Sequence, residues 1–367
     1  MIYDHILDEY KKMTFVLLAL LVPIFIVNVK FEFKDSLSIV FAFLLFGWCC
    51  STPDWGVYQT RYYNWDGYMI NLTEPLYTKT MQLLNYWNFE FQSVYITIAF
   101  TFIISFTFLV RKLTFNISYV VGLMLISIFP MIITMQRSAY AFCFVFFAFY
   151  ALFFADSLWI KVTLFSACIV TATLIHSMCI MYFVFLGAYF IKDKTIYKYI
   201  KIAIPITIFF LGVIQYFMSD FFVFLDMSKK MDMLNNALDQ TTSITKRTFL
   251  ANLKVLSVIA LPIGLNYLLK IKYNQRFTAF DNMVLKLNIA GLIFCPLLYL
   301  AHDICRLFYV IAIIDFCVAS HYLKYKYCKW YSIFCCFNIG YWFIYRPYFE
   351  YVFVQIYSNN LLFDFLL

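Results

Sequence analysis

The chain has 367 residues, of which 64% are hydrophobic and only 13% are charged. An ordinary soluble domain has about 45–50% apolar and about 25% charged residues. A soluble fold of this chain would have too few polar residues to cover its apolar side chains, so the composition excludes one. The same figures exclude an intrinsically disordered chain. The composition predicts an all-α polytopic integral membrane protein. Its net charge of +8 needs no nucleic-acid partner, because cytoplasmic loops of membrane proteins are basic.

Long apolar runs follow one another along the whole chain. A helix that crosses the hydrocarbon core of a bilayer needs about 20 apolar residues. We treat residues 1–367 as a single membrane domain and predict about twelve transmembrane helices. They lie near residues 13–29, 36–50, 93–110, 117–135, 138–155, 158–175, 177–191, 202–218, 250–271, 283–300, 304–322 and 331–345.

The distribution of Lys and Arg predicts how these helices are oriented. With the N-terminus outside, the inner segments are strongly basic, whereas the outer segments hold similar numbers of bases and acids. Cytoplasmic loops show this bias. Lys11 and Lys12 precede the first predicted span and favour the opposite placement of the first hairpin, so its orientation stays open. Two long segments, 51–92 and 219–249, become outer loops in this topology.

The first outer loop, 51–92, combines charged and aromatic residues. Apolar residues at helical spacing after Pro75 predict an amphipathic helix that lies on the membrane surface. One interpretation of the loop is a solvated segment with an aromatic belt at the interface. The other is a carbohydrate-facing loop whose carboxylates act as bases. The candidates for chemistry here are Asp54, Arg61, Asp66 and Glu74.

Two polar residues punctuate the next apolar hairpins of the chain. Arg137 stands between two apolar runs, where an arginine costs about 2.5–3.5 kcal/mol on insertion scales. It either reaches to the headgroups by snorkelling or has a function. His176 lies at the next outer turn and is either a packing residue or a proton acceptor suited to neutral pH. The predicted topology places both residues on the outer face.

The segment LAHDICRLFYV carries a further polar group. Asp303 and Arg306 are three residues apart, so they share a helix face and are candidates for a structural ion pair. With the neighbouring His302, they are also candidates for the site. Arg247 precedes the predicted span 250–271 and is a candidate for contact with a headgroup or a lipid phosphate.

Together these residues favour one reaction class. The topology gathers arginines, histidines and carboxylates on the outer face. Arginine binds phosphate with a fork of N–H donors and stays charged, and a carboxylate or a histidine can take a proton from a hydroxyl. This set suits group transfer from a lipid diphosphate. The eleven cysteines form no CxxC pair and no acidic metal-binding cluster is evident, so we expect neither a metal nor another cofactor.

The same residues carry a resemblance to a known family. The segments occur in this order: PDWGVYQTRY with Asp54 and Tyr58, Thr73-Glu74-Pro75, MQRSAYA with Gln136 and Arg137, IHS with His176, and CRLFYV with Arg306 and Tyr309. On these motifs the chain resembles the EpsG-type branch of the Wzy-like O-antigen (polysaccharide) polymerases. The resemblance covers roughly residues 40–320, and the order and spacing of the motifs carry it more than any single motif.

The resemblance implies a fold similar to that of C-type membrane glycosyltransferases and the O-antigen ligase. It also implies polymerisation of O-antigen, capsule or exopolysaccharide repeat units without a metal. The growing glycan leaves undecaprenyl diphosphate and joins a hydroxyl of a lipid-linked repeat unit. This reaction takes place at the periplasmic or outer face of the bacterial cytoplasmic (inner) membrane. A separate chain-length regulator is a typical partner.

Carried over to this sequence, the resemblance also implies roles for individual residues. The candidates for the general base on the acceptor hydroxyl are His176, Glu74 and Asp54. The residues expected to hold the diphosphate are Arg137 and Arg306, with Arg61 and Arg247 as secondary candidates. The further candidates for substrate contact are Tyr58, Gln136, His302, Asp303 and Tyr309.

Four other interpretations stay open. A flippase for lipid-linked oligosaccharides, or another transporter, needs a polar path through the membrane. The main mid-span charges are Lys254 and Asp315, and the chain has only 9 Gly and 8 Pro, which disfavours helices that break or rock. An O-antigen ligase would share the fold and the chemistry. A membrane acyltransferase with a histidine near the membrane face and a purely structural role are the remaining alternatives.

Overall fold

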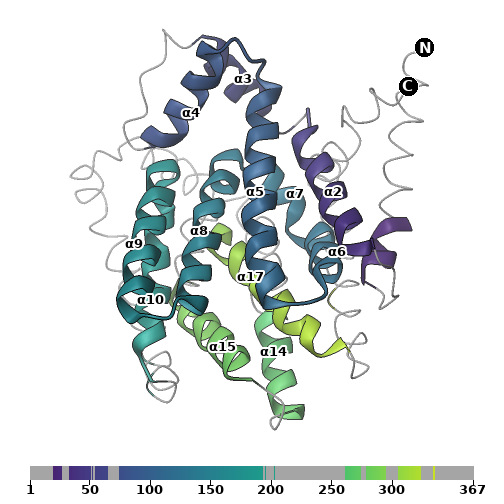
Figure 1. The fold of residues 1–367 in the computed structure, drawn as a ribbon, viewed down its shortest axis with the longest axis vertical. Coiled ribbons are helices and arrows are strands. Elements are labelled where there is room, and N and C mark those ends of the chain that lie inside the picture. The colour runs from purple at the N-terminus through teal and green to yellow at the C-terminus, as the bar shows by residue number, and fades with distance from the viewer. Residues whose placement is uncertain are drawn as a thin grey trace, which may run out of the picture. The chain divides into compact units, whose positions relative to one another are not determined.

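The computed structural model of the chain describes residues 20–26, 33–50, 52, 54–64, 74–192, 195, 202, 261–273, 278–294, 305–323 and 334. In these ranges the chain folds into helices and contains no β-strand (Figure 1). The helices are α2 (Lys34–Gly47), α3 (Trp55–Tyr63), α4 (Pro75–Tyr86), α5 (Gln92–Leu113), α6 (Ile117–Ser127), α7 (Phe129–Thr134), α8 (Gln136–Phe154), α9 (Leu158–Ile175), η2 (Ser177–Tyr182), α10 (Phe183–Phe190), α14 (Leu261–Lys272), α15 (Ala279–Gly291), η5 (Leu292–Phe294) and α17 (Leu307–His321).

The chain forms two compact units. The first unit comprises residues 1–183 and 312–367, and the second comprises residues 184–311. The single membrane domain predicted from the sequence, with its outer loops, stays a prediction. The second of those loops, 219–249, lies outside the described residues.

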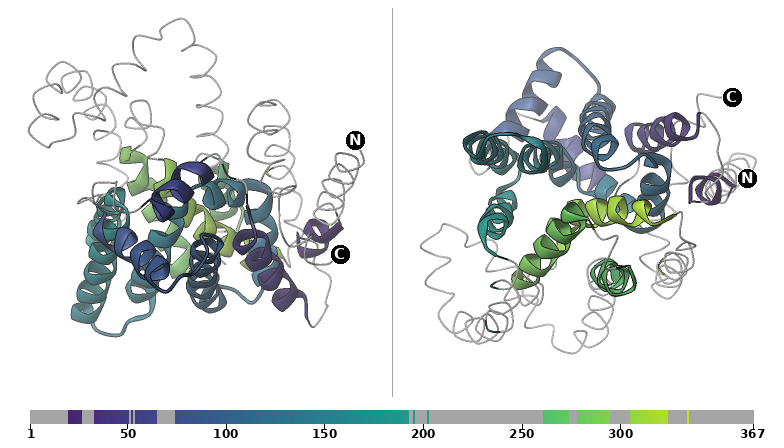
Figure 2. Two further views of the ribbon diagram at one scale, coloured as in Figure 1. Left: turned by 90° about the horizontal axis from the view of Figure 1, so that it is seen from above. Right: turned by 60° about the horizontal axis from the view of Figure 1, so that its bottom comes forward.

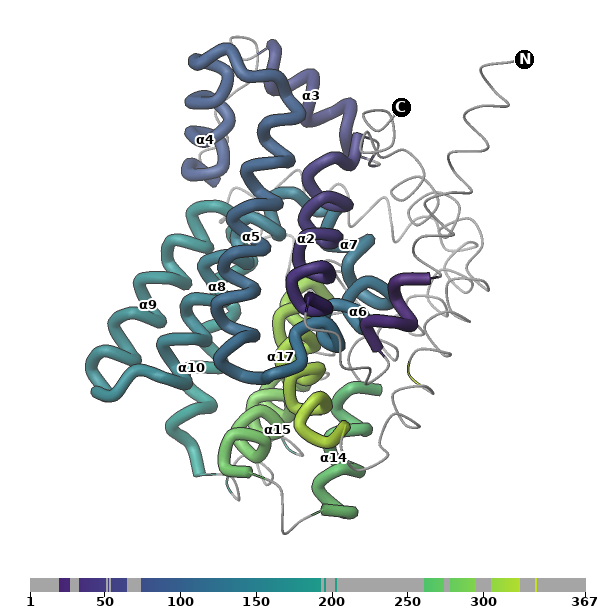
Figure 3. The backbone as a smooth tube through the Cα atoms, turned by 45° about the vertical axis from the view of Figure 1, so that its right-hand side comes forward, coloured from purple at the N-terminus to yellow at the C-terminus, as the bar shows by residue number. Residues whose placement is uncertain are grey.

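In the first unit, α8 packs between α5 and α9, and α2 packs on α5 and α6. Figure 3 shows α2, α5, α8 and α9 side by side, and Figure 2 shows the α8–α9 pair from two further directions. Phenylalanine rings fill the interfaces: Phe102 of α5 lies 5.4 Å from Phe146 of α8, and Phe149 of α8 lies 6.0 Å from Phe165 of α9. Edge-to-face ring pairs stabilise such contacts beyond their buried area.

Three helices of the described residues are long and apolar enough to cross a membrane: α5, α8 and α9. They coincide with the predicted spans 93–110, 138–155 and 158–175. Shorter apolar helices occupy 117–127, 177–190 and 307–321. The total of twelve spans is not confirmed. The predicted spans 202–218 and 331–345 lie outside the described residues except for residues 202 and 334.

The predicted span 117–135 is not one continuous helix. It divides into α6 and α7 at Ile128. The cause is Pro130, which has no N–H to donate to the residue four positions before it and whose ring crowds that residue's carbonyl group. The predicted span 177–191 likewise begins as the 3₁₀ helix η2 before it continues as α10.

Besides Ile128, two connections between the described helices of the first unit consist of a single residue. Met135 alone joins α7 to α8, and His176 alone joins α9 to η2. Both have backbone angles outside the helical region (φ −109°, ψ 64° and φ −147°, ψ 110°). As a result Arg137 lies in the first turn of α8, and His176 directly follows the last turn of α9.

The α3–α4 pair lies at the N-terminal end of α5 (Figure 1). Trp55 of α3 stacks on Tyr95 of α5 with ring centroids 4.5 Å apart. Helix α4 occupies the stretch where the sequence predicts an amphipathic helix. It buries Tyr77 and Met81 and leaves Leu83 exposed, with Trp87 exposed just after its last turn. Its contact with a membrane surface stays a prediction.

The second unit contains α14, α15, most of α10 and the first turn of α17. Thr278 and Asp281 form a capping box that starts α15. Further along α15, Lys286 is buried and its Nζ donates to the carbonyl oxygen of Tyr189 in α10, at 3.0 Å. Basic side chains commonly bind the last carbonyl groups of a helix in this way.

Gly122 lies at a position of the first unit that leaves no room for a side chain. A Cβ atom at this position would lie 2.8 Å from Cγ1 of Ile26 and 3.2 Å from Cβ of Phe25. We expect Gly122→Ala to destabilise the protein by about 1–3 kcal/mol, because it forces atoms into an interface that is already packed. Thermal unfolding of the purified protein in detergent should show a lower Tm.

Gly187 in α10 is the matched control, because a Cβ there meets nothing within 4 Å. Gly187→Ala should keep or raise the Tm, since alanine is favoured over glycine inside a helix by roughly 0.5–1 kcal/mol. An unchanged Tm for Gly122→Ala would contradict this packing.

Candidate functional site

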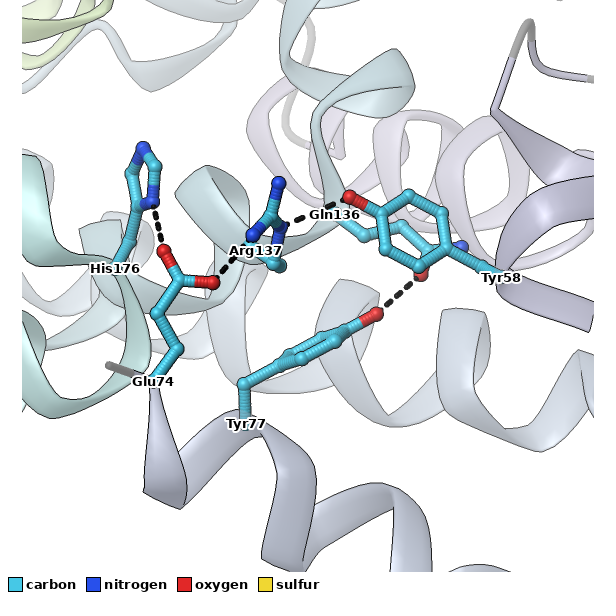
Figure 4. Close-up of polar contacts among 6 residues, drawn as sticks. All are labelled: Tyr58, Glu74, Tyr77, Gln136, Arg137 and His176. Atoms are coloured by element: carbon cyan, nitrogen blue, oxygen red, sulfur yellow. Dashed lines mark hydrogen bonds and ion pairs between the residues drawn. The ribbon is translucent and has the colours of Figure 1, made fainter. Parts of the chain in front are cut away.

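Polar side chains from three helices and two helix junctions meet near the N-terminus of α8 (Figure 4). Four of them are linked in one chain of contacts, which we call the Glu74 cluster: Tyr58, Glu74, Arg137 and His176. Tyr58 comes from α3, Glu74 from the residue before α4, Arg137 from α8 and His176 from the end of α9. These positions are far apart in the sequence, so the fold itself assembles the cluster.

Glu74 lies at the centre of the cluster. Its Oε1 lies 2.8 Å from Nδ1 of His176, and its Oε2 accepts a hydrogen bond from Nη1 of Arg137. Only 4% of the residue is exposed. Pro75 explains its position, because the residue before a proline is disfavoured in the helical region. Glu74 therefore stays outside α4 (φ −136°, ψ 59°), where its side chain reaches α8 and the end of α9.

The surroundings of Glu74 keep it ionised at neutral pH. Burial raises the pKa of this carboxyl, but the hydrogen bond with His176 and the positive charge of Arg137 outweigh burial and lower the pKa to about 2. The carboxylate is therefore a permanent negative charge and a hydrogen-bond acceptor. It is a poor proton acceptor at neutral pH.

Of the two ring nitrogens of His176, Nδ1 is hydrogen-bonded and Nε2 has no partner among the described residues. Because an ionised carboxylate only accepts hydrogen bonds, Nδ1 carries the hydrogen that faces Glu74. In the neutral ring, Nε2 then holds the lone pair. Nε2 is buried and has no hydrogen-bond partner among the described residues. An unpartnered polar atom in a buried position is unusual in a native structure and requires an explanation.

Arg137 is held on two sides. Its Nε donates to the hydroxyl of Tyr58 at 2.9 Å, and its Nη1 donates to Glu74. Nη2 makes no such contact with the described residues, and 30% of the side chain is exposed. In Figure 4 the free nitrogens of Arg137 and His176 both point to the side of the cluster that lies away from Glu74. A hydrogen-bond donor and a proton acceptor thus face the same region.

Two further residues support the cluster. The hydroxyl of Tyr77 in α4 donates to Oε1 of Gln136 at 2.8 Å, which fixes the first residue of α8 against α4. Burial raises the pKa of Tyr58, and the neighbouring Arg137 lowers it in part. The hydroxyl of Tyr58 therefore stays protonated at neutral pH. Tyr77 was not predicted from the sequence. The chain has 30 Tyr, and only its position three residues after Glu74 distinguishes Tyr77 from the others in the sequence.

The structure places the remaining candidates elsewhere. Asp54 precedes α3, is exposed, and its side chain makes no hydrogen bond or ion pair with the described residues. Arg61 is exposed in the last turn of α3. Arg306 and Tyr309 belong to the second unit, where the buried hydroxyl of Tyr309 lies 3.5 Å from Sγ of Cys305. Four candidates lie outside the described residues: Asp66, Arg247, His302 and Asp303.

The low pKa of Glu74 predicts a specific dependence of stability on pH. The pKa in the folded protein, about 2, lies below the ordinary value of 4.5. Ionised Glu74 therefore adds to the free energy of unfolding above pH 4.5, and this contribution is lost as the pH falls from 4.5 towards 2. The Tm of the wild type should exceed that of Glu74→Gln at pH 5, and this margin should shrink as the pH falls towards 3. A margin that stays constant down to pH 3 would contradict this assignment.

Comparison with known proteins places the chain in a family. The model of the EpsG family matches residues 34–363, which is nearly the whole chain. The match includes every residue of the Glu74 cluster. No curated protein and no solved structure matches the chain.

Proposed function

We propose that this chain, which belongs to the EpsG family, is a membrane glycosyltransferase that polymerises a polysaccharide. The family is associated with polysaccharide polymerases, and the apolar helices are those of a multi-pass membrane protein. In the proposed reaction, a growing glycan leaves undecaprenyl diphosphate and is joined to a hydroxyl of a lipid-linked repeat unit. The proposed location is the outer face of the bacterial cytoplasmic membrane.

The observation that carries the proposal is a pair of nitrogens without a hydrogen-bond partner among the described residues: the buried Nε2 of His176 and Nη2 of Arg137, which point to the same side of the cluster (Figure 4). Nε2 takes the proton of the acceptor hydroxyl as its oxygen attacks the anomeric carbon of the donor glycan. The bond between that carbon and the diphosphate oxygen breaks, and the electron pair leaves with undecaprenyl diphosphate. Arg137 stabilises the negative charge that develops on this leaving group. The proton on His176 then passes to water.

The position of the Glu74 cluster along α5, near one end of this helix, is compatible with binding of a lipid diphosphate. Helices α5 and α8 run in the same direction, since Cys143 lies 3.6 Å from Thr101 and Tyr150 lies beside Phe108. Arg137 is therefore level with Tyr95, about one turn below the start of α5. The 22 residues of α5 span about 33 Å, close to the thickness of the hydrocarbon core. The cluster thus lies near one boundary of that core, where the phosphates of a lipid are found.

Arginines replace a metal in the proposed reaction. Arg137 supplies the charge that a divalent cation would otherwise supply to the leaving group. Arg306 is the proposed second phosphate contact, with Arg61 and Arg247 in supporting positions. The proposed partners are the donor and acceptor undecaprenyl-diphosphate oligosaccharides and a chain-length regulator.

The test is deletion of the gene in its native host, followed by electrophoresis of the surface glycan. The proposal predicts that the polymer ladder collapses to a lipid core that carries one repeat unit. Loss of the repeat unit from the surface would instead identify an exporter. Polymer that persists but is never joined to the lipid core would identify a ligase. Either of these two results overturns the proposal.

A further inference from the structure

The carboxylate of Glu74 is shared between two groups with different tasks. Oε1 binds the imidazole of His176, and Oε2 binds the guanidinium of Arg137. In the proposed function, the imidazole of His176 takes the proton of the acceptor hydroxyl, and the guanidinium of Arg137 stabilises the diphosphate of the donor. Glu74 itself has both oxygen atoms occupied and is 4% exposed, so it offers no atom to a substrate. Its contribution must pass through its two neighbours.

The contact with His176 fixes the tautomer of the ring. With its hydrogen on Nδ1, the neutral imidazole presents the lone pair of Nε2 to the free side of the cluster. Without an acceptor at Nδ1, the ring could place its hydrogen on Nε2, and that nitrogen would then be unable to take a proton. Glu74 therefore orients the ring and also sets which nitrogen is basic.

The contact with Arg137 links the strength of the base to the occupancy of the phosphate site. In the free protein, the charge of Arg137 compensates part of the negative charge of Glu74. A phosphate bound at Nη2 competes with Glu74 for the guanidinium, so the hydrogen bond from Nη1 to Oε2 weakens and the carboxylate binds the Nδ1 hydrogen of His176 more strongly through Oε1. The other titratable groups around Glu74 are Tyr58, Tyr77 and Cys179, and Asp54 lies near Tyr58. None of these described groups bridges His176 and Arg137.

We propose that Glu74 is the positioning residue of the site, and that through it a phosphate bound at Arg137 makes His176 a stronger proton acceptor. This inference rests on the proposed function. It means that the acceptor hydroxyl is activated most effectively once the donor diphosphate is in place.

The experiment monitors the imidazole of His176 directly. The full-length protein, with ¹³C,¹⁵N-histidine, is placed in lipid nanodiscs and titrated between pH 5 and pH 9 by NMR, with and without inorganic diphosphate. The chain has 4 His, and the His176→Asn spectrum assigns the signal. In the wild type, the neutral ring should show its hydrogen on Nδ1, and diphosphate should move the titration midpoint of His176 to higher pH. Glu74→Gln keeps an acceptor oxygen and loses the charge, so its midpoint should move by less than half as much.

The matched control is Glu90→Gln, because Glu90 is exposed in the α4–α5 connection. It should respond to diphosphate as the wild type does. Glu74→Asp keeps the charge and should recover part of the response, which a merely structural role of Glu74 would not predict. In cells, Glu74→Gln should slow polymer formation about tenfold or more, but less than His176→Ala does.

Two outcomes would overturn the inference. One is a midpoint in Glu74→Gln that responds to diphosphate as fully as in the wild type. The other is a wild-type ring with its hydrogen on Nε2. The proposed function fails separately, when His176→Ala leaves the polymer ladder intact. If His176→Ala abolishes the ladder while Glu74→Gln titrates and responds normally, the function stands and the inference about Glu74 is wrong.

Discussion

His176→Ala should abolish long polymer and leave single repeat units on the lipid core. The substitution removes Nε2, which has no hydrogen-bond partner in the described part of the chain and which the proposed mechanism uses to take the hydroxyl proton. General base catalysis contributes about 10²–10⁴-fold to a rate, and a polymerase slowed by this factor would add too few units to form a ladder. The measurement is electrophoresis of surface glycan from a deletion strain that carries the variant gene.

His321→Ala is the matched control. This histidine ends α17, and its Nε2 contacts the carbonyl oxygen of Leu113 at 2.7 Å, at the end of α5 remote from the Glu74 cluster. The control should keep its ladder when both variants reach the membrane in equal amounts, as judged by an epitope tag. A full ladder from His176→Ala would show that His176 is not the base.

Arg137→Lys should be nearly as damaging, although it preserves the positive charge. The guanidinium reaches Tyr58 through Nε and Glu74 through Nη1, and it still has Nη2 for a phosphate. The single Nζ of a lysine has no such spread of fixed donors. Loss of one preorganised donor to a developing negative charge costs about 10²–10³-fold in rate. We therefore expect very short chains or single repeat units in the same electrophoretic assay.

Arg111→Lys controls for the loss of a guanidinium as such. Arg111 is exposed in the last turn of α5, at the end remote from the cluster. Its substitution should leave chain length unchanged. If Arg137→Lys gives polymer of full length, charge alone suffices at this position and the guanidinium geometry has no role.

Much of the first unit could be predicted from the sequence, for a physical reason. The spans 93–110, 138–155 and 158–175 are unbroken apolar runs with polar residues at both ends, and they coincide with α5, α8 and α9. Hydropathy reports composition along the chain and is blind to backbone breaks inside an apolar run. The division of 117–135 at Ile128 was therefore not predicted, although Pro130 was visible in the sequence.

The candidate site could be predicted residue by residue, but its connections could not. The sequence singled out Arg137 and His176 because polar residues are rare between apolar runs, and it singled out Glu74 as a carboxylate of the polar loop 51–92. It left the base open among three residues. A periodic pattern relates residues a few positions apart, whereas Glu74 and His176 are separated by 102 positions. Only the fold shows that Glu74 binds both His176 and Arg137.

The single-residue connections at Met135 and His176 restrict how the gene can vary in length. Each residue added to a helix rotates the rest of that helix by about 100° and advances it by about 1.5 Å. An insertion or deletion inside α9 would therefore turn His176 away from Glu74, and one inside α7 would turn Arg137 away from it. Variation of the gene that preserves the proposed function is therefore expected to keep the spacing from Met135 to His176.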